Sequence, residues 1–425
     1  MTTLAVIMII LMATLGAPLF SIFGAGALFG FHASGVNTEA VIIQMTQLVS
    51  APALVAIPLF TFAGYLMAES KTPERLVAVS QALIGWMPGG LAFVTIVACA
   101  FFTAFTGASG VTIIALGGIL YPILKKRGYP EEFSLGLVTC CGSLGLLFPP
   151  SLPIILYGII GQVDVDKLFI AGIIPGFLLV VLLGLYSTVV GGKATGRIKF
   201  KAKDALKAVR AAAWELPLPF IVLVGVYGGY TTASEAAAVC AFYVFVVEVF
   251  IYRDLSLTKD VPRVMKDSMV LVGGILIIVA VALGFTNFVI DQEVPMKLFA
   301  LTKRYITSPY MFLTILDLFL LIVGCLIDIF SAIIVVVPMI IPVAAGYDIN
   351  PYHLAIVFLT NMEIGYLTPP FGLNLFLSSY RFKKPVAKVF ADSLPFVIIL
   401  LVALAILTYI PAVSTILVEK FYPSH

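Results

Sequence analysis

Two pairs of adjacent prolines, Pro149-Pro150 and Pro369-Pro370, lie inside apolar stretches of this chain. Proline has no amide hydrogen, so it cannot bond the carbonyl four residues earlier in a helix. Each pair also pushes the preceding residue out of helical geometry. We therefore expect both helices to unwind and to free four backbone carbonyls, those of Gly145, Leu146, Gly365 and Tyr366.

Hydroxyl and amide side chains lie beside these two breaks and inside two other apolar stretches. Free carbonyls and hydroxyls suit a hard cation such as sodium, whereas the N-termini of half-helices carry partial positive charge and suit an anion. Asp328, Ser331 and Thr368 belong to the same set of polar groups. The candidate substrate-binding residues are Thr106, Ser109, Thr112, Ser151 and Asn374.

Asp328 raises a sharper question, because a carboxylate in mid-membrane costs at least ~2.5 kcal/mol. No Lys or Arg occurs between Arg304 and Arg381, so an ion pair within its own apolar stretch is excluded. Asp328 is either a sodium ligand or a protonated hydrogen-bond donor. Glu363, just before the second proline pair, poses a similar question.

The composition indicates a membrane protein. Of 425 residues, 61% are hydrophobic and 11% are charged, whereas soluble domains carry about a quarter charged residues. The five scattered cysteines and three distant histidines lack the spacing of a disulfide framework or a metal site. No HExxH or GxxxxGK[ST] motif occurs, which argues against a membrane-embedded protease and an ATP-driven pump.

Apolar segments recur along the whole chain and predict an all-α polytopic membrane protein with a single membrane domain, 1–425. Two apolar stretches, 89–124 and 309–345, are too long for one span and are interrupted by polar or small residues. They suggest re-entrant hairpins, since non-helical backbone at membrane depth must be buried in protein or face a cavity. The predicted spans are 4–30, 40–68, 132–161, 168–191, 215–230, 234–252, 268–290, 352–379 and 391–418.

An internal repeat follows from landmarks that recur after 220 residues, including the segments 145–150 and 365–370. Repeat 1 is 1–191, with hairpin 89–124 and broken helix 132–161. Residues 192–231 form a cytoplasmic basic loop and an extra span. Repeat 2 is 232–425, with hairpin 309–345 and broken helix 352–379. The extra span makes the second copy inverted, a layout typical of secondary transporters.

The basic clusters set the orientation. Lysines and arginines gather at 125–127, 193–210, 253–266 and 381–388, which the predicted spans place on one face. We assign that face to the cytoplasm. Short amphipathic stretches at 70–88 and 291–308 are expected to lie along the interface.

Several motifs together resemble the large membrane subunit of tripartite ATP-independent periplasmic (TRAP) transporters, the DctM-like family. The resemblance covers nearly the whole chain, and the combination of motifs is specific. The resembling stretches are 105–112, 126–129, 145–157, 232–238 and 365–374.

The resemblance implies a sodium-driven, elevator-type carrier in the bacterial inner membrane. It implies two partners, a small four-span membrane subunit and a periplasmic substrate-binding protein, and a small organic acid as substrate, of the sialic acid or C4-dicarboxylate class. No nucleic-acid partner is expected. The sodium positions carried over from the family are Ser109, Gly110, Gly145, Pro149, Asp328, Ser331, Gly365 and Thr368.

One position departs from the family pattern, since many relatives have an acidic residue near Thr112. The site that contains Thr112 would then bind its ion through uncharged oxygen atoms. The main alternative is a stand-alone sodium- or proton-coupled anion carrier that needs no binding protein. A structural scaffold subunit is a further reading, but it gives no reason for two opposed oxygen-rich breaks.

Overall fold

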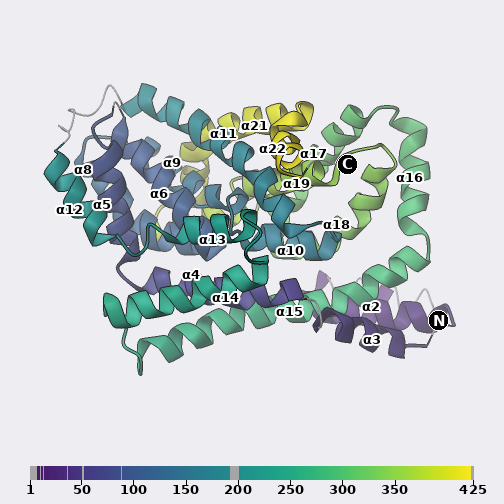
Figure 1. The fold of residues 1–425 in the computed structure, drawn as a ribbon. Helices are drawn as coiled ribbons and strands as arrows, with labels where there is room; N and C mark the ends of the chain where they lie inside the picture. The colour runs from purple at the N-terminus through teal and green to yellow at the C-terminus, as the bar shows by residue number, and fades with distance from the viewer. Residues whose placement is uncertain are drawn as a thin grey trace.

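The computed structural model describes residues 7–9, 11–12, 14–35, 37–49, 52–87, 89–191 and 201–422. Across these ranges the regular secondary structure is helical, and no strand occurs in them (Figure 1). In the N-terminal half the helices are α2 (Leu19–Ala33), α3 (Glu39–Val49), η1 (Pro52–Val55), α4 (Ala56–Glu69), α5 (Thr72–Ile84), α6 (Gly90–Thr106), α7 (Ser109–Thr112), η2 (Ile113–Gly117), α8 (Gly118–Lys126), α9 (Glu131–Cys141), η3 (Leu144–Leu147), α10 (Leu152–Gly161) and α11 (Val165–Gly191). They are followed by α12 (Ala202–Ala211), α13 (Leu218–Tyr227), α14 (Ala233–Val246), η4 (Val247–Ile251), α15 (Asp260–Asp291), α16 (Val294–Tyr305), α17 (Pro309–Leu326), α18 (Ile329–Ala345), α19 (Pro351–Gly365), α20 (Leu373–Phe382), α21 (Val386–Tyr409) and α22 (Ala412–Phe421).

The helices are long and apolar enough for a multi-pass membrane protein. Among the described residues, six are able to cross a bilayer by length and composition, and the bent unit α9–η3–α10 raises the number to seven. Each such helix needs a run of roughly 20 apolar residues, which the composition of the chain supplies. The predicted class, an all-α polytopic membrane protein, is confirmed.

Several predicted boundaries were wrong in detail. The span 40–68 contains the 3-10 helix η1 directly before α4, and residues 50–51 lie outside the described residues. The span 391–418 is divided where α21 ends and α22 begins. Within the predicted loop 192–231, residues 192–200 lie outside the described residues, and the rest contains α12 and α13. Since α13 has 10 residues, it is about 15 Å long and is too short to cross the bilayer core by itself.

Both long apolar stretches are divided near their middle. α6 ends at Thr106, Gly107 adopts φ +63°, and α7 begins at Ser109. The left-handed φ costs glycine little, which is why the chain turns here. In the second stretch α17 ends at Leu326 and α18 begins at Ile329. Whether these stretches are re-entrant in a bilayer stays a prediction.

The two predicted broken helices are interrupted at their proline pairs. α9 and η3 are followed by α10 after a bend of 45°, and the segment 366–372 separates α19 from α20. Both Pro149-Pro150 and Pro369-Pro370 are joined by cis peptide bonds. The unwinding expected from the missing proline amides is therefore present at both sites.

The helix boundaries recur along the chain. α17, α20 and α21 begin 219, 221 and 221 residues after α6, α10 and α11. The corresponding amphipathic helices α5 and α16 lie at opposite ends of the molecule, and both run across the direction of α14 and α15 (Figure 1). Division of the chain into two inverted copies stays a prediction.

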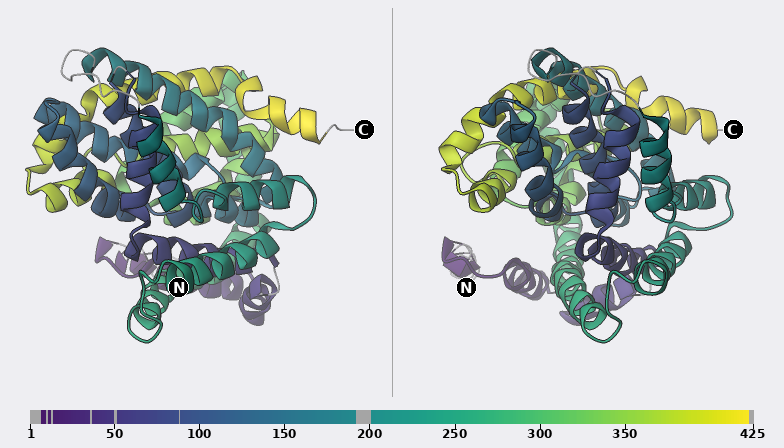
Figure 2. Two further views of the ribbon diagram at one scale, coloured as in Figure 1. Left: turned by 60° about the vertical axis from the view of Figure 1, so that its left-hand side comes forward. Right: turned by 90° about the vertical axis from the view of Figure 1, so that its left-hand side faces the viewer.

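Two layers of helices make up the molecule. In one layer, α14 and α15 pack with α2, α3 and α4. The other holds the two divided stretches and the two broken helices, together with α11 and α21 (Figures 1 and 2). α4 also packs on α6 and α10, and α15 packs on α18, so these helices join the layers.

Glycines permit the closest approach between each divided stretch and its broken helix. A Cβ built on Gly145 would lie 2.3 Å from the carbonyl oxygen of Ala100 in α6. A Cβ on Gly365 would lie 2.6 Å from the Cα of Gly324 in α17. Since real Cβ atoms do not come this close to backbone, both positions require glycine for packing, independently of any ligand.

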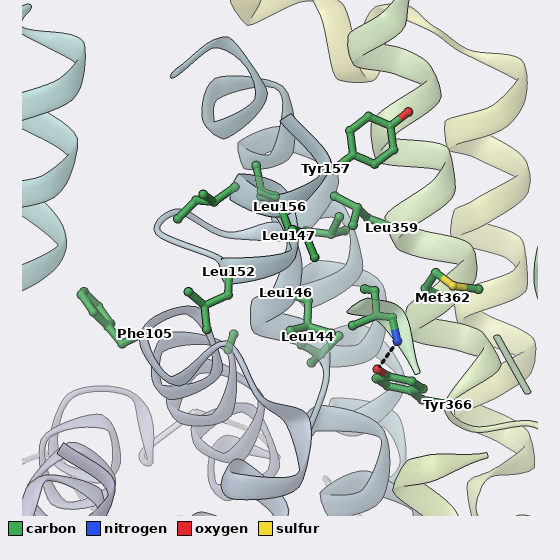
Figure 3. Close-up of a cluster of buried hydrophobic side chains, with 14 of the residues drawn as sticks. Phe105, Leu144, Leu146, Leu147, Leu152, Leu156, Tyr157, Leu359, Met362 and Tyr366 are labelled. Carbon is green, nitrogen blue, oxygen red and sulfur yellow. Dashed lines mark hydrogen bonds between the residues drawn. The ribbon is translucent and has the colours of Figure 1, made fainter. Parts of the chain in front are cut away.

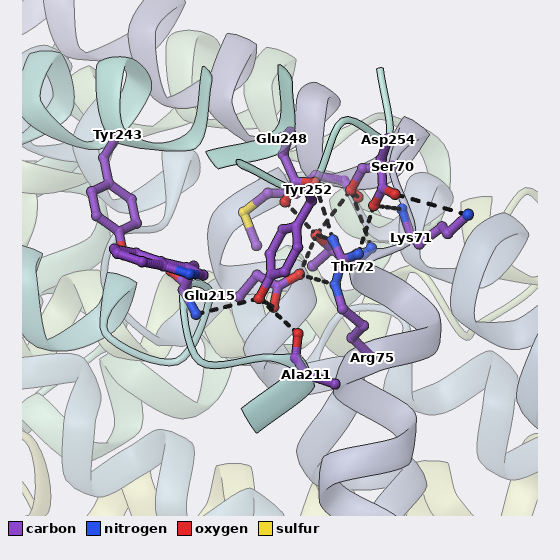
Figure 4. Close-up of polar contacts among 12 residues, drawn as sticks. Ser70, Lys71, Thr72, Arg75, Ala211, Glu215, Tyr243, Glu248, Tyr252 and Asp254 are labelled. Atoms are coloured by element: carbon purple, nitrogen blue, oxygen red, sulfur yellow. Dashed lines mark hydrogen bonds and ion pairs between the residues drawn. The ribbon is translucent and has the colours of Figure 1, made fainter. Parts of the chain in front are cut away.

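Arg75 is the centre of an ionic cluster that joins α5 to η4, the continuation of α14 (Figure 4). Its guanidinium pairs with Glu215 after α12, with Glu248 in η4 at 3.1 Å, and with Asp254 at 2.6 Å. The same group stacks on the ring of Tyr252, with its carbon 3.9 Å from the ring centroid. The Arg75 side chain is 14% exposed, so the cluster fixes α5 against η4 and the turn after it.

Replacement of Arg75 by methionine should destabilise the fold, because three carboxylates would lose their shared cation. Breaking a buried ion pair on one side costs about 3–5 kcal/mol, which denaturant unfolding in detergent, followed by tryptophan fluorescence, would measure. Lys71→Met is the matched control, since Lys71 is 75% exposed and lies 3.9 Å from Asp254; exposed pairs contribute about 0–1 kcal/mol. Equal losses in the two variants would contradict a structural role for the cluster.

Candidate functional site

The break in the first divided stretch lies against the start of α10. A Cβ on Gly107 would come within 2.5 Å of the Leu152 side chain, so the residues on either side, Thr106 and Ser151, belong to one buried region. The hydroxyl oxygens of Thr106 and Ser151 are both buried and have no hydrogen-bond partner among the described residues. Because buried hydroxyls are normally satisfied, this region is suited to a ligand that supplies the missing partner.

Thr112 takes part in a second group of hydroxyls close by. Its Oγ1 lies 2.7 Å from Oγ1 of Thr103 in α6, and Thr103 lies 3.0 Å from the Gly142 carbonyl, to which it donates. Ser109 begins α7 and is buried. Gly110 faces α20, since a Cβ there would lie 2.7 Å from the Leu377 side chain.

Asn374 of α20 joins this polar region to the C-terminal half of the chain. Its amide nitrogen donates to the Thr139 carbonyl at 3.4 Å and to the Ser143 hydroxyl at 3.3 Å, and its amide oxygen is buried without a partner in the described part of the chain. Thr139 also donates to Ser378 at 2.8 Å. The α9–α20 contact therefore carries polar groups from both halves of the chain.

Asp328 caps a helix at the second break. Its carboxylate accepts bonds from the amides of Phe330 at 3.0 Å and Ser331 at 3.1 Å, and from the Ser331 hydroxyl. The backbone amide of Ile329 donates to the hydroxyl of Tyr366 at 2.7 Å (Figure 3). Asp328 is exposed on the surface of this chain. Phe330 and Ser331 of its own turn are the hydrogen-bond partners that the sequence alone did not identify.

Three of the four carbonyls expected to be free are in fact bonded. The Gly145 carbonyl accepts from Phe148 at 3.0 Å, and that of Tyr366 accepts from Asn374 at 3.1 Å. Gly365 accepts from both the amide and the hydroxyl of Thr368, at 3.1 and 2.9 Å. The expectation was wrong here because tight local turns and the next helix supply donors in place of the missing proline amides.

An apolar core brings the two broken helices together (Figure 3). Leu147 of η3 and Leu156 of α10 face Leu359 of α19, and all three are buried. Tyr157 and Phe358 pack with ring centroids 5.6 Å apart. Each broken helix is thus held by the other, and the unwound segments occupy fixed places.

The site residues fall into two groups. Six of the predicted positions lie around the first break and its contact with α10, and Asn374 reaches the same region through Thr139 and Ser143; the six are Thr106, Ser109, Gly110, Thr112, Gly145 and Ser151. Pro149 lies two residues before Ser151 and forms the first cis peptide bond with Pro150. The remaining positions surround Tyr366 at the second break: Asp328, Ser331, Gly365 and Thr368.

The first group is more buried than the second. Ser151 and Pro149 are buried, whereas in the second group Asp328 is exposed and Thr368 is partly exposed, although Ser331 and Gly365 are buried. Within the described residues no group of three His, Cys, Asp or Glu side chains is placed to hold a metal ion. Any cation here would have to be bound mainly by hydroxyl and carbonyl oxygens, which is the donor set of a hard ion.

Sequence reasoning missed Thr103, Thr139, Ser143 and Ser378. A signal for one pair was present, because Asn374 and Ser378 are four residues apart on one face of α20. Ser143 lies in the turn after α9, so its spacing from Thr139 gave no such signal. Sequence reasoning also missed Asp317, which accepts bonds from Asn361 at 2.7 Å and from Thr408 at 2.9 Å.

Comparison with known proteins shows the family of this chain. The family model for the DctM component of the tripartite ATP-independent periplasmic transporter matches residues 5–413. The chain is similar to the C4-dicarboxylate TRAP transporter large permease protein DctM of Pseudomonas aeruginosa, with 36% identity over 92% of each chain. It is also similar to the ectoine/5-hydroxyectoine TRAP transporter large permease protein UehC of Ruegeria pomeroyi, with 32% identity over 98% of each.

A solved structure supports the fold alone. The YdaH transporter of Alcanivorax borkumensis superposes with a TM-score of 0.63 at 14% identity, covering 87% of this chain and 86% of that one. The family match spans almost the entire sequence and includes both broken helices and both divided stretches. The chain belongs to the family of TRAP transporter large permease subunits, membrane proteins that transport solutes rather than catalyse reactions.

Proposed function

We propose that this chain imports a small organic acid through the bacterial inner membrane, driven by a sodium gradient. The observation that carries the proposal is the set of buried, unpartnered oxygens of Thr106, Ser151 and Asn374 beside an unwound helix. Ligand-free hydroxyl and amide oxygens deep in a membrane protein are costly, and a transported solute and its coupling ion would satisfy them. Membership of a permease family supports transport as the reason for keeping them.

The helix ends support the proposed substrate class. α10 and α20 begin at the breaks, and their N-termini favour negative charge. The N-terminus of α18 is already capped by the Asp328 carboxylate. A carboxylate would bind there without requiring a lysine or arginine. The Pseudomonas relative is named for C4-dicarboxylates, and we propose a substrate of that class or a sialic acid.

Sodium is proposed as the coupling ion at both breaks. The first set of oxygens is Ser109, Gly110, Gly145 and Pro149, and the second is Asp328, Ser331, Gly365 and Thr368. Since the Gly365 carbonyl already accepts two bonds, sodium at the second site would require the Thr368 hydroxyl to turn away from it. The hydroxyl oxygen would then become a ligand itself.

Alternating access is proposed to follow an elevator mechanism with inverted repeats. The opposite positions of α5 and α16 (Figure 1) and the recurrence of helix boundaries support the inversion. The moving part would contain the divided stretches and broken helices, and the layer of α14 and α15 would stay fixed. In the family, a large permease works with a small membrane subunit and a periplasmic binding protein, and we propose a four-span subunit and a substrate-capturing protein for this chain.

Solute uptake in proteoliposomes tests the proposed function. Vesicles would hold this chain and the small subunit, with the binding protein added outside and a C4-dicarboxylate or sialic acid offered. We expect accumulation only when an inward sodium gradient and the binding protein are both present. Uptake without the binding protein would identify a stand-alone carrier, and uptake indifferent to sodium but dependent on a proton gradient would contradict sodium coupling.

Thr106→Val tests the unpartnered hydroxyl. Removing a buried hydroxyl that lacks a protein partner should leave stability equal or higher, yet a lost bond to a charged ligand costs about 1.5–3 kcal/mol. We therefore expect the substrate concentration for half-maximal uptake to rise by roughly 10-fold or more, with no fall in melting temperature.

The matched control is Thr95→Val in the same helix. Thr95 is also buried, but its hydroxyl donates to the Leu91 carbonyl of its own helix at 3.0 Å. This variant should leave the uptake curve unchanged. If Thr106→Val and Thr95→Val gave the same uptake curve, Thr106 would have no part in the site.

A further inference from the structure

A groove lies between side chains of α5, α12 and the residue after α8. Figure 1 places these three helices at one end of the molecule. Its volume is about 430 Å³. The lining combines small apolar residues with a tryptophan and several charged groups: Ala78, Gln81, Ala82, Trp86, Arg127, Lys201, Asp204, Lys207, Ala208 and Ala211. α5 packs on α6 and α12 packs on α5, so the groove is linked to the first divided stretch through α5.

The lining is strongly cationic. Three cations, Arg127, Lys201 and Lys207, face one acid, Asp204. In the part of the chain that the structure describes, none of the three cations is joined to a carboxylate by an ion pair. Lys125, two residues before Arg127, differs because it pairs with Glu131 at 3.1 Å. The groove therefore offers unneutralised positive charge to an anion.

The surroundings of the groove are those of a membrane interface. α5 and α12 lie at the end of the molecule and across the direction of the long helices α14 and α15 (Figures 1 and 2). The Trp86 side chain is 47% exposed, and the exposed Leu83 and Leu206 project from the two helices. Tryptophan is enriched at the headgroup level of bilayers, and amphipathic helices with basic and apolar faces lie in that plane.

From these observations we propose that the groove binds the headgroup of an anionic phospholipid. The lipid phosphate would lie between Arg127, Lys201 and Lys207, above the alanines, and its acyl chains would run outward past Leu83 and Leu206. The basic clusters assign this end to the cytoplasmic face, whose leaflet carries anionic lipid. Such a lipid would bridge α5, which packs on the first divided stretch, and α12, which leads toward α13 and α14.

Native mass spectrometry of the purified full chain, titrated with phosphatidylglycerol or with phosphatidylcholine, tests the proposal. The groove variant combines Arg127→Gln, Lys201→Gln and Lys207→Gln. Each basic residue near a membrane contributes to anionic lipid binding, so the apparent affinity for phosphatidylglycerol should fall at least about tenfold. Phosphatidylcholine should bind the wild-type chain much more weakly.

The matched control combines Lys126→Gln, Lys203→Gln and Arg210→Gln. It removes the same charge from the same helices and their ends, but none of these side chains lines the groove. We expect it to retain phosphatidylglycerol. A second variant, Ala82→Phe, fills the groove and keeps all the charges; it too should lose the lipid.

Three results would overturn the proposal. If the groove variant and the control variant lost affinity for phosphatidylglycerol equally, the lipid would be held by diffuse surface charge. If Ala82→Phe bound phosphatidylglycerol as tightly as the wild-type chain, the lipid would lie elsewhere. Displacement of the lipid by glycerol 3-phosphate at a similar concentration would identify a site for a soluble phosphate. Gel filtration and thermal unfolding show whether each variant is folded. If the triple charge variant is not folded, Ala82→Phe still tests the proposal.

Discussion

The broken helices of this protein depend on one constraint, that backbone polar groups in a bilayer need partners within the protein. A helix meets this constraint along its length and fails it where it unwinds. The two proline pairs unwind helices within apolar stretches, so the segments 145–151 and 366–372 depend on neighbouring structure for their hydrogen bonds. The structure supplies most of them through local turns, through Thr368 and through the amide of Asn374.

The groups that remain unsatisfied are informative because so many others are satisfied. Hydroxyls such as Thr95 donate to their own helix, whereas Thr106 and Ser151 have buried oxygens without partners in the described residues. Gly145 lets the first broken helix pack directly on α6, the helix that ends at Thr106. Buried oxygens without partners among the described residues, placed at a break, are suited to binding, and the family supplies transport as the context.

The sequence predicted features that depend on local chemistry. The proline pairs, and the polar residues Ser109 and Asp328, predicted the places where helices end. Helix starts recur along the chain, but its division into two repeats stays a prediction. The sequence did not predict how carbonyls would be bonded, because the donors come from turns whose geometry depends on packing. It also missed Arg75 with its three carboxylates, and Asn374 with Thr139, since these partners are 140 to 235 residues apart.

The central claim is that the breaks bind sodium through oxygen atoms. Binding of radioactive sodium to the purified chain, measured against increasing sodium and with potassium as competitor, tests it most directly. We predict saturable binding that potassium does not displace, and an affinity that Asp328→Ala weakens by roughly 10-fold while the exposed control Asp291→Ala leaves it unchanged. Absence of saturable sodium binding in the wild-type chain, or equal affinities in the two variants, would contradict the account.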